Sequence, residues 1–482
     1  MRRIIVLLIY LILSFLLIGC SNNSNKNREN QIQTNVTKDI NSDANIVGTI
    51  APTTIPTITP TITPQTVKKI NIDDNQFIDN LKELSKTPRK FDTDGEQRAL
   101  KFLVDKMAEY GYQTQTQDFS VYHLGKDWFT PASKQVYFEQ NREETKKFGS
   151  GINVIASTAN SDTKKTLYVT AHYDTTDDTN GIRDNGSGVV VAMEIARQLQ
   201  GINLPINVKY VFFSAEEAGL QGSAYFVWHL TKEEKDNAIG CINIDVVGQK
   251  GDYEVVLKTN QQNINVLSIL MDEFHDFHHF WSSASDHTSF YMGEIPAIYF
   301  ADNKALLKDT SENPLNELDI DKLKNLTKII CDFLIKFNMS DYEKVLQNGF
   351  LKNYTNLPET EEVNGFSLIQ ANKVLNKNGA SSDIEYILKN DNGKQVVITE
   401  RDYRFLDNTI ITDIQTFNVY NDHVKYKVSE KNNKIYIQYT DTWLGYKYYI
   451  LEGNITKDEA LELLINQSKF TKDGVLLLDI RD

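Results

Sequence analysis

Several side chains that could bind a divalent metal ion lie within one short part of the sequence. They are the imidazole of His172 and the carboxylates of Asp174, Asp184, Glu216, Glu217 and Asp245. Each follows an apolar run or precedes a helical pattern, which places it at a strand end or a helix start. Nitrogen and oxygen ligands of this kind suit zinc. Because a bound metal ion activates water as a nucleophile, these residues predict hydrolytic chemistry.

Each of these elements has an ordinary structural reading when it is taken alone. Asp-Asn-Gly usually forms a turn, as we expect at Asp391, and adjacent glutamates such as Glu233 and Glu234 usually begin a solvated helix. Their context favours the functional reading, because ligands of an open parallel sheet collect beyond the carboxyl ends of its strands. Gly186 and Gly188 let the backbone approach closely where Asp184 turns inward.

Apolar runs and helical patterns alternate around these residues. Residues 153–156, 166–170, 207–213 and 241–245 read as buried strands, and residues 94–110, 189–199 and 319–337 read as helices. Strands that alternate with helices predict a mixed, mostly parallel sheet covered by helices on both faces, an α/β class. We expect this domain to span residues 69–338.

The first residues predict an exported, lipid-anchored protein. Arg2 and Arg3 precede an apolar run over residues 4–18, which is too short to favour a stable membrane span. The run ends in Leu-Ile-Gly-Cys20, which resembles the lipobox of bacterial lipoproteins. That resemblance implies a signal peptide over residues 1–19, a diacylglycerol on Cys20, and a location at the cell membrane facing the extracellular side. An ordinary signal peptide or an uncleaved anchor is the alternative.

Residues 20–68 are rich in Asn, Ser, Thr and Gln, and repeat Thr-Ile-Thr-Pro at residues 57–60 and 61–64. Such a composition buries too little apolar surface to offset the entropy of ordering, so we expect a disordered tether. At about 3.1 Å per residue it reaches at most roughly 150 Å.

Residues 339–482 have a different character from the preceding domain. Asn-rich turns separate Tyr and Val runs, with hairpins expected at residues 391–393 and 432–433 and a helix from about Lys457, where Thr456 and Glu459 can form a capping box. We expect a separate, strand-rich α+β domain.

Composition limits the remaining function classes. The 482 residues have 40% hydrophobic residues, enough for real cores, and a formal net charge of -14, which argues against nucleic acid as a partner. After Cys20, only Cys241 and Cys331 remain, too few for a disulfide scaffold.

The order and spacing of the candidate ligands resemble the M28 family of metallopeptidases, the aminopeptidase type with two metal ions. The resemblance covers roughly residues 77–338 and includes Ser285-Asp286-His287. It implies a phosphorylase/hydrolase-like topology, zinc as cofactor and peptides as substrates, with removal of amino-terminal residues.

The resemblance also implies a role for each candidate residue. His172 and Asp245 would bind one zinc ion, Glu217 would bind the second, and Asp184 would bridge both. Glu216 would be the general base that takes a proton from water and returns it to the leaving amine. Asp174 would hold His172 in the tautomer that metal binding requires.

One departure from the family pattern affects the second metal. The family places its last metal-binding histidine in a His-Thr-x-x-Asp-Thr pattern, and the matching segment here has Ala305 in that place, followed by Asp309 and Thr310. The site of His172, Asp184 and Asp245 keeps its three ligands, whereas the site of Glu217 loses one. His287 or Asp302 are possible substitutes.

The missing histidine also argues against a glutaminyl cyclase. Those enzymes share the fold, and their single zinc site resembles the Glu217 site, which lacks a ligand here. The missing histidine leaves a second interpretation open, in which the chain is a catalytically degenerate binding protein at the cell surface.

Overall fold

The computed structural model describes eleven segments of the chain: residues 70–122, 147–158, 163–260, 264–304, 314–354, 365–402, 415–418, 425–431, 434–441, 445–453 and 455–465. The expectations for the signal peptide, for Cys20, for the tether and for Ala305 fall outside these segments.

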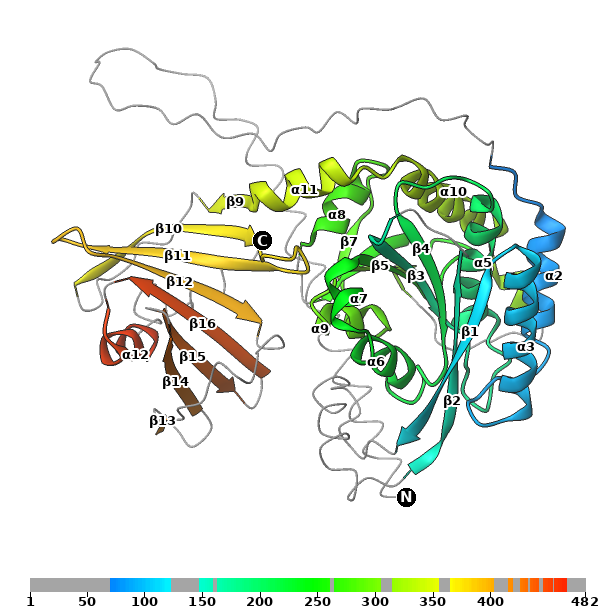
Figure 1. Cartoon of the computed structure of the whole chain (residues 1–482), viewed down its shortest axis with the longest axis horizontal. Helices are drawn as coiled ribbons and strands as arrows, with labels where there is room; N and C mark the ends of the chain where they lie inside the picture. The colour runs from blue at the N-terminus through cyan, green and yellow to red at the C-terminus, as the bar shows by residue number, and fades with distance from the viewer. Residues whose placement is uncertain are drawn as a thin grey trace, which may run out of the picture. The chain divides into compact units, whose positions relative to one another are not determined.

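The first sheet is formed by β1 (Gln113–Tyr122), β2 (Lys147–Ser157), β3 (Thr166–His172), β4 (Asn207–Phe213), β5 (Ala238–Ile244), β6 (Val255–Thr259), β7 (His279–Trp281) and β8 (Ala297–Asp302). The strand order is β1-β2-β4-β3-β5-β8-β6-β7. Figure 1 shows β1 and β2 side by side at one edge of this sheet. The central strands β4, β3, β5 and β8 run parallel, and β1 and β2 pair antiparallel with their neighbours. β6 pairs antiparallel with β8 and parallel with β7. The expected mixed, mostly parallel sheet is therefore confirmed.

The helices around this sheet are α2 (Asp74–Leu84), α3 (Asp94–Glu109), α5 (Gly188–Leu199), α6 (Gln221–Trp228), α7 (Lys232–Asn237), α8 (Val266–Asp272), α9 (His287–Met292), α10 (Ile320–Lys336) and α11 (Met339–Asn348). A π-helical turn, η1 (Ile182–Ser187), precedes α5, and a 3₁₀ turn, η3 (Pro314–Glu317), precedes α10.

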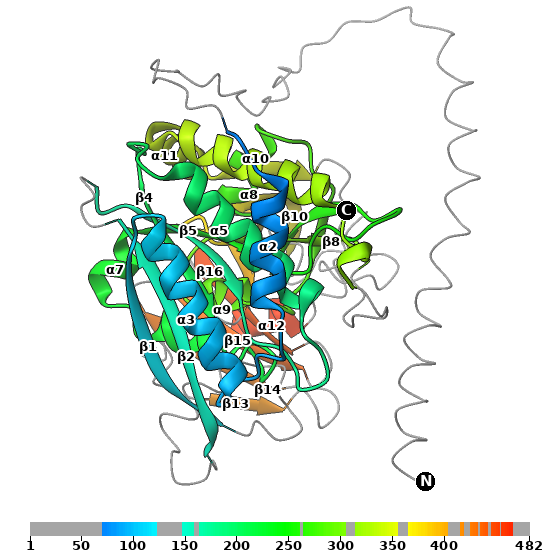
Figure 2. The ribbon, with the colours of Figure 1, turned by 90° about the vertical axis from the view of Figure 1, so that its right-hand side faces the viewer.

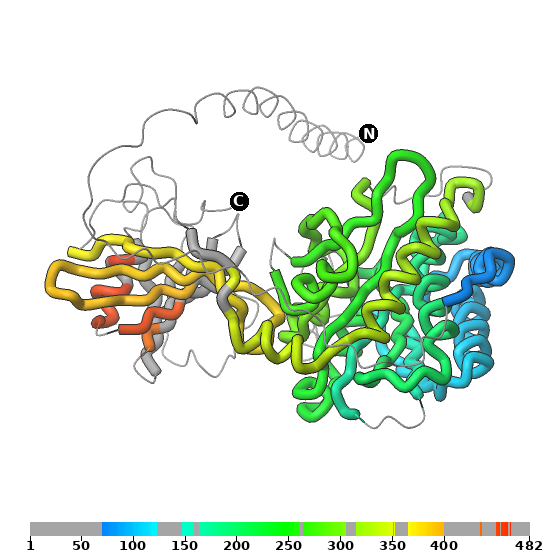
Figure 3. Tube along the Cα trace, turned by 90° about the horizontal axis from the view of Figure 1, so that it is seen from above, coloured from blue at the N-terminus to red at the C-terminus, as the bar shows by residue number. Residues whose placement is uncertain are grey.

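Helices cover both faces of the sheet because successive side chains of a strand point to opposite faces. In β3, Leu167 and Val169 join the large apolar cluster that also includes residues of α2, α3, α5, α8 and α10. Tyr168, between them, joins a second cluster with Phe226 of α6 and Phe290 of α9. Figures 2 and 3 show α2 and α3 lying side by side on the face that is covered by the large apolar cluster. All seven residues of β3 are buried, which explains why the apolar residues Leu167, Tyr168 and Val169 follow one another without alternation.

The edge strand β1 was not foreseen as a strand. Its sequence is polar, and most of its residues are exposed or half-buried, with Phe119 and Val121 as the buried exceptions. An edge strand needs little apolar surface, so its sequence resembles a loop.

The second sheet is antiparallel, as expected for the C-terminal region. It comprises β9 (Phe350–Tyr354), β10 (Phe366–Leu375), β11 (Ser382–Asn390), β12 (Gln395–Asp402), β13 (Gln415–Asn418), β14 (Lys425–Lys431), β15 (Lys434–Asp441) and β16 (Gly445–Gly453), with helix α12 (Lys457–Ile465). Their order is β13-β14-β15-β16-β12-β11-β10-β9. Both expected hairpins are confirmed by the pairing of β11 with β12 and of β14 with β15. Thr456 and Glu459 form the expected cap.

Among the described residues, no helix combines the length and the apolar character needed to cross a lipid bilayer.

The buried face of α3 supplies a test of the core. We expect Leu103→Ala to lower the free energy of unfolding by about 2–5 kcal/mol, because the side chain is fully buried and its removal leaves a cavity. Lys101→Ala, on the exposed face of the same helix, should change it by less than about 0.5 kcal/mol. Equilibrium denaturation of both variants measures the difference, and equal losses would contradict the placement of this helix face.

Candidate metal centre

The candidate ligands lie at one edge of the first sheet because they follow parallel strands. His172 is the last residue of β3, Glu216 and Glu217 come shortly after β4, and Asp245 directly follows β5. The carboxyl ends of parallel strands meet at the same edge, where ligands of open sheets bind. Asp184 reaches this edge from η1, in which its backbone leaves the helical conformation (φ -105°, ψ 99°).

The structure brings His172, Asp184 and Asp245 together. Nε2 of His172 lies 3.1 Å from Oδ1 of Asp245 and 3.2 Å from Oδ1 of Asp184. One ligand atom from each residue can be chosen so that all lie within 4.8 Å of one another. Ligand atoms around a tetrahedral zinc ion stand roughly 3.4 Å apart when each bond is about 2.1 Å, so this spacing fits a zinc ion.

The charge balance also fits a cation at this position. Besides Asp184 and Asp245, the acidic side chains of Asp174, Glu216 and Asp286 are buried or nearly so in the same region. Buried charges are normally paired or bound to metal. His172 alone cannot neutralise these carboxylates, and a bound divalent ion would supply the missing positive charge.

The acidic crowding changes the pKa values of the site. Burial alone would lower the pKa of His172, but the carboxylates of Asp245 and Glu216, with smaller contributions from Asp174 and Asp184, raise it well above its usual value. Burial, with repulsion between carboxylates, also raises the pKa of Glu216 well above its usual value and that of Glu217 to about 8. Without a bound metal ion, the carboxyl groups of Glu216 and Glu217 are therefore protonated more readily than those of ordinary glutamates.

Glu216 and Glu217 take different positions relative to the three-residue group. Oε2 of Glu216 lies 4.0 Å from Nε2 of His172, close enough for a single water molecule to contact both. Glu217 is not a member of the group, and its main electrostatic neighbour is Asp184. The geometry is compatible with the roles that the family resemblance implies, which remain predictions.

Asp174 connects the histidine to the two glutamates, a link that sequence reasoning missed. Its Oδ1 accepts a hydrogen bond from the backbone N–H of Glu216 (3.1 Å), and its Oδ2 accepts one from Glu217 (3.3 Å). Oδ1 also faces Nδ1 of His172 at 3.4 Å, beyond the usual hydrogen-bond range. Asp174 thus orients the backbone of both glutamates as well as facing the imidazole.

Asn185 connects the Asp184 turn to the strand that carries Asp245. Its Nδ2 donates to the carbonyl of Ile244 (2.9 Å), and its Oδ1 accepts from the N–H groups of Gly188 (2.9 Å) and Val246 (3.2 Å). A Cβ on Gly188 would lie 2.2 Å from the same carbonyl oxygen, which confirms the expected close approach. The position of Asn185 directly after a candidate ligand was the only sequence signal for this role.

Ser285 holds the other oxygen of Asp245. Its hydroxyl donates to Oδ2 of Asp245 (2.6 Å) and accepts from Nδ2 of Asn243 (2.8 Å). Asp286 is fully buried beside it, and burial raises its pKa to about 7. Ser285 therefore holds the candidate ligand Asp245 from the loop before α9.

The side chains of the two suggested substitute ligands, His287 and Asp302, make other contacts in the structure. Nε2 of His287 bonds to the carbonyl of Ser282 (2.8 Å), its ring stacks on Tyr299 (4.8 Å between centroids), and burial lowers its pKa to about 4. Both carboxylate oxygens of Asp302 accept backbone N–H groups, from Gly248 and Gln249.

Comparison with known proteins relates this part of the chain to peptidases. The model of Peptidase family M28 matches residues 153–334, which contain every candidate metal ligand. Aminopeptidase Y of Saccharomyces cerevisiae is 29% identical over 155 residues, covering 30% of this chain and 29% of that protein. Aminopeptidase YwaD of Bacillus subtilis is 38% identical over 94 residues, covering 20% of this chain and 21% of that protein. The chain thus spans less than a third of the length of these relatives.

Among solved structures, an aminopeptidase from Aneurinibacillus sp. strain AM-1 aligns with a TM-score of 0.46 and 17% identity, covering 55% of this chain and 94% of that one. The family match confirms the M28 resemblance for the part of the chain that carries the site.

Zinc should stabilise the folded chain through this group. We expect added zinc to raise the thermal unfolding midpoint, with a gain of about 2.7 kcal/mol at a hundredfold excess over the dissociation constant. Asp245→Asn should abolish the shift, while Asp276→Asn, at an exposed position, should leave it unchanged.

The zinc-induced shift should also depend on pH in a defined direction. Because the carboxylates raise the pKa of His172, the imidazole carries a proton that zinc must displace. The shift should therefore shrink as the pH falls and grow as it rises. Differential scanning calorimetry across pH measures both effects, and an equal shift in Asp245→Asn would exclude this zinc site.

Proposed function

We propose that this chain is a zinc-dependent aminopeptidase that acts on peptides at the outer face of the cell membrane. The observation that carries the proposal is the convergence of His172, Asp184 and Asp245 at the carboxyl edge of the sheet, with Glu216 beside them. The match to Peptidase family M28 over these residues supports a peptidase. Removal of amino-terminal residues is supported by relatives that are named aminopeptidases.

The residues of the three-residue group would hold the first zinc ion, and Glu217 with Asp184 would hold a second. When bound, zinc lowers the pKa of coordinated water towards about 7 and polarises a carbonyl group. The protein's part is to orient these carboxylates, which the hydrogen bonds from Ser285 to Asp245 and from the backbone N–H groups of Glu216 and Glu217 to Asp174 accomplish.

Glu216 is suited to move the proton during hydrolysis. Its carboxylate accepts a proton from the attacking water as the water oxygen bonds to the peptide carbonyl carbon. The same proton then passes to the amine as the carbon–nitrogen bond breaks. Burial raises the pKa of Glu216 well above its usual value, which favours the transfer of its proton to the leaving amine.

The cellular location is proposed from the sequence. The Arg2-Arg3 start, the apolar run that follows and Cys20 support export and lipidation, and residues 20–68 support a spacer between the membrane and the enzyme. Labelling with a radioactive fatty acid tests this part, since Cys20→Ser should lose the label and release the protein from the membrane.

Replacement of the proposed base is the sharpest test of the activity. We expect Glu216→Gln to lower kcat for aminoacyl amides by about 10²–10⁴-fold, because the amide cannot accept a proton. Its zinc content should equal that of the wild type, since Glu216 is not in the ligand group. Glu233→Gln, an exposed member of another glutamate pair, is the matched control and should keep full activity.

Metal analysis and steady-state kinetics on the full-length chain measure these effects. A wild-type protein that binds zinc and hydrolyses none of a series of aminoacyl amides would instead be a binding protein that has lost a metal ligand. The substitution at Ala305 is the sequence feature that favours this second candidate.

The Ala305 position supplies a separate test of the second metal site. If Ala305 occupies the place of the family's last histidine, Ala305→His should raise the zinc content by up to one ion per chain and increase the hydrolytic rate. Lys304→His, one residue earlier, is the control for an added imidazole. Equal zinc content in both variants and the wild type would show that the assignment of this position is wrong.

A further inference from the structure

Residues 87–98, called here the clamp segment, lie against both loops that carry the candidate catalytic residues. The segment includes the last residues before α3 and the first turns of that helix. Its buried charged side chains, Arg89 and Glu96, point in different directions: Arg89 reaches the loop after β3, and Glu96 reaches the end of β4.

Arg89 holds the two ends of the loop that joins His172 to Asp184. Its Nε donates to the carbonyl of Tyr173 (2.7 Å), and its Nη1 and Nη2 donate to the carbonyls of Asn180 (2.5 Å) and Gly181 (2.9 Å). The backbone N–H of Arg89 donates to the hydroxyl of Thr175 (2.8 Å). The loop is therefore fixed where it leaves the strand and where it enters η1.

Glu96 holds Ser214, which directly follows β4 and lies two positions before Glu216. Its Oε1 accepts from the hydroxyl of Ser214 (2.5 Å) and from the N–H of Ile152 (3.3 Å), and lies 3.4 Å from the hydroxyl of Tyr173. Its Oε2 accepts from the N–H of Asp92 (2.8 Å), next to the helix cap. One carboxylate thus joins α3, β2 and the ends of β3 and β4.

The contacts of Glu96 require a carboxylate. Both oxygens face a backbone N–H group, so the NH₂ group of a glutamine would meet a donor in either orientation. Glu96 is 1% exposed, and no ion pair joins it to a basic side chain in the described part of the chain. Burial raises its pKa to about 7. Stability alone gives little reason to keep an unpaired buried acid.

The contact to Ser214 leads to Glu216 and Glu217 through the backbone. Ser214 is followed by Ala215, which has a positive φ of 56°, and then by the two glutamates. Their N–H groups bond to Asp174, whose own loop is held by Arg89. The glutamate loop is thus held between Asp174 on one side and the Glu96–Ser214 contact on the other.

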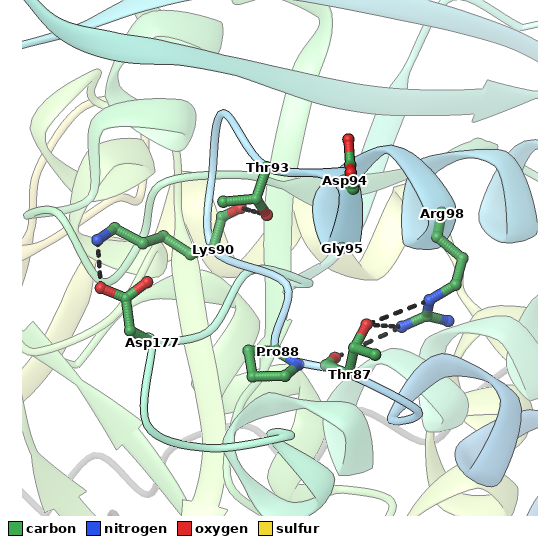
Figure 4. Close-up of a pocket in the computed structure, with 8 residues that line it drawn as sticks. All are labelled: Thr87, Pro88, Lys90, Thr93, Asp94, Gly95, Arg98 and Asp177. Carbon is green, nitrogen blue, oxygen red and sulfur yellow. Dashed lines mark hydrogen bonds and ion pairs between the residues drawn. The ribbon is translucent and has the colours of Figure 1, made fainter.

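The outer face of the clamp segment is fixed as well (Figure 4). Lys90 forms an ion pair with Asp177 of the β3–η1 loop (2.5 Å), and Arg98 bonds to the hydroxyl of Thr87 (3.0 Å). These contacts line a surface hollow that contains none of the candidate metal ligands. The Lys90–Asp177 ion pair joins the segment to the β3–η1 loop from outside, while Arg89 and Glu96 act from within.

We propose that Glu96 is a positioning residue that sets Glu216 and Glu217 in place through its hydrogen bond to Ser214. This inference rests on the proposed function for its kinetic consequences and on the structure alone for its effect on the loop. Glu96 touches neither substrate nor metal in this assignment.

The test compares Glu96→Gln, Ser214→Ala and the double variant in the full-length chain. We expect each single variant to lower kcat by roughly ten- to a hundredfold, with zinc content unchanged and KM within about twofold. The double variant should fall no further than Glu96→Gln alone, because both changes remove the same contact. Glu194→Gln, a buried carboxylate on α5 that bonds to Arg197, is the control and should keep the wild-type kcat.

Hydrogen exchange provides a readout that needs no activity. The N–H groups of Glu216 and Glu217 should exchange roughly tenfold faster in Glu96→Gln and in Ser214→Ala, while those of α10 stay at wild-type rates. Should Glu96→Gln fail to fold, Ser214→Ala still decides the question.

Unchanged amide exchange rates at residues 214–220 would overturn the proposal. It would also be overturned if the loss in kcat of the double variant equalled the product of the two single losses, or if Glu194→Gln lost as much kcat. Absence of hydrolysis by the wild type would refute the proposed function only, because the exchange rates report the loop in either case.

Discussion

The crowding of buried carboxylates around one imidazole is the interaction on which the rest of this structure depends. His172, Asp184 and Asp245 converge at the carboxyl edge of a parallel sheet whose strands are themselves buried. Because these side chains are hardly exposed to water, the attraction between the carboxylates and His172 is stronger, and so is the repulsion between the carboxylates. A divalent cation bound at this edge would reduce the repulsion between the carboxylates. The fold therefore concentrates negative charge at a position suited to a metal ion. Burial, with repulsion from the neighbouring carboxylates, raises the pKa values of Glu216 and Glu217.

The surrounding chain counters this repulsion with hydrogen bonds between side chains and backbone. Asp174 fixes the two glutamates, Asn185 fixes the Asp184 turn against the end of β5, and Ser285 fixes Asp245. Arg89 and Glu96 reach the same loops from the clamp segment. Loops have few regular hydrogen bonds of their own, so these side chains supply the partners that a helix or a strand would supply. The candidate site is therefore held by elements from distant parts of the chain.

Much of the fold could be predicted from periodicity. The helix expected at residues 319–337 is α10, and the run at residues 207–213 is β4 with the same bounds. Burial on both faces makes such strands continuously apolar, and a single buried stripe makes such helices periodic. β1 was not predicted, because an edge strand whose side chains are mostly exposed to solvent has a polar sequence. The candidate ligands could be named because their residue types and their positions after strands are local properties.

The sequence by itself determined the residue types of the site, their order along the chain and the strands that they follow, because the chemistry of ligands and the burial of strands act over a few residues. Only the tertiary structure decided which groups meet. It placed Asp174 against the backbone of Glu216 and Glu217, and it left His287 bonded to Ser282 and outside the ligand group. It also joined Glu96 to Ser214, 118 positions later in the chain. Such contacts depend on how strands pair and how helices pack over the whole sheet, and no local pattern encodes that arrangement.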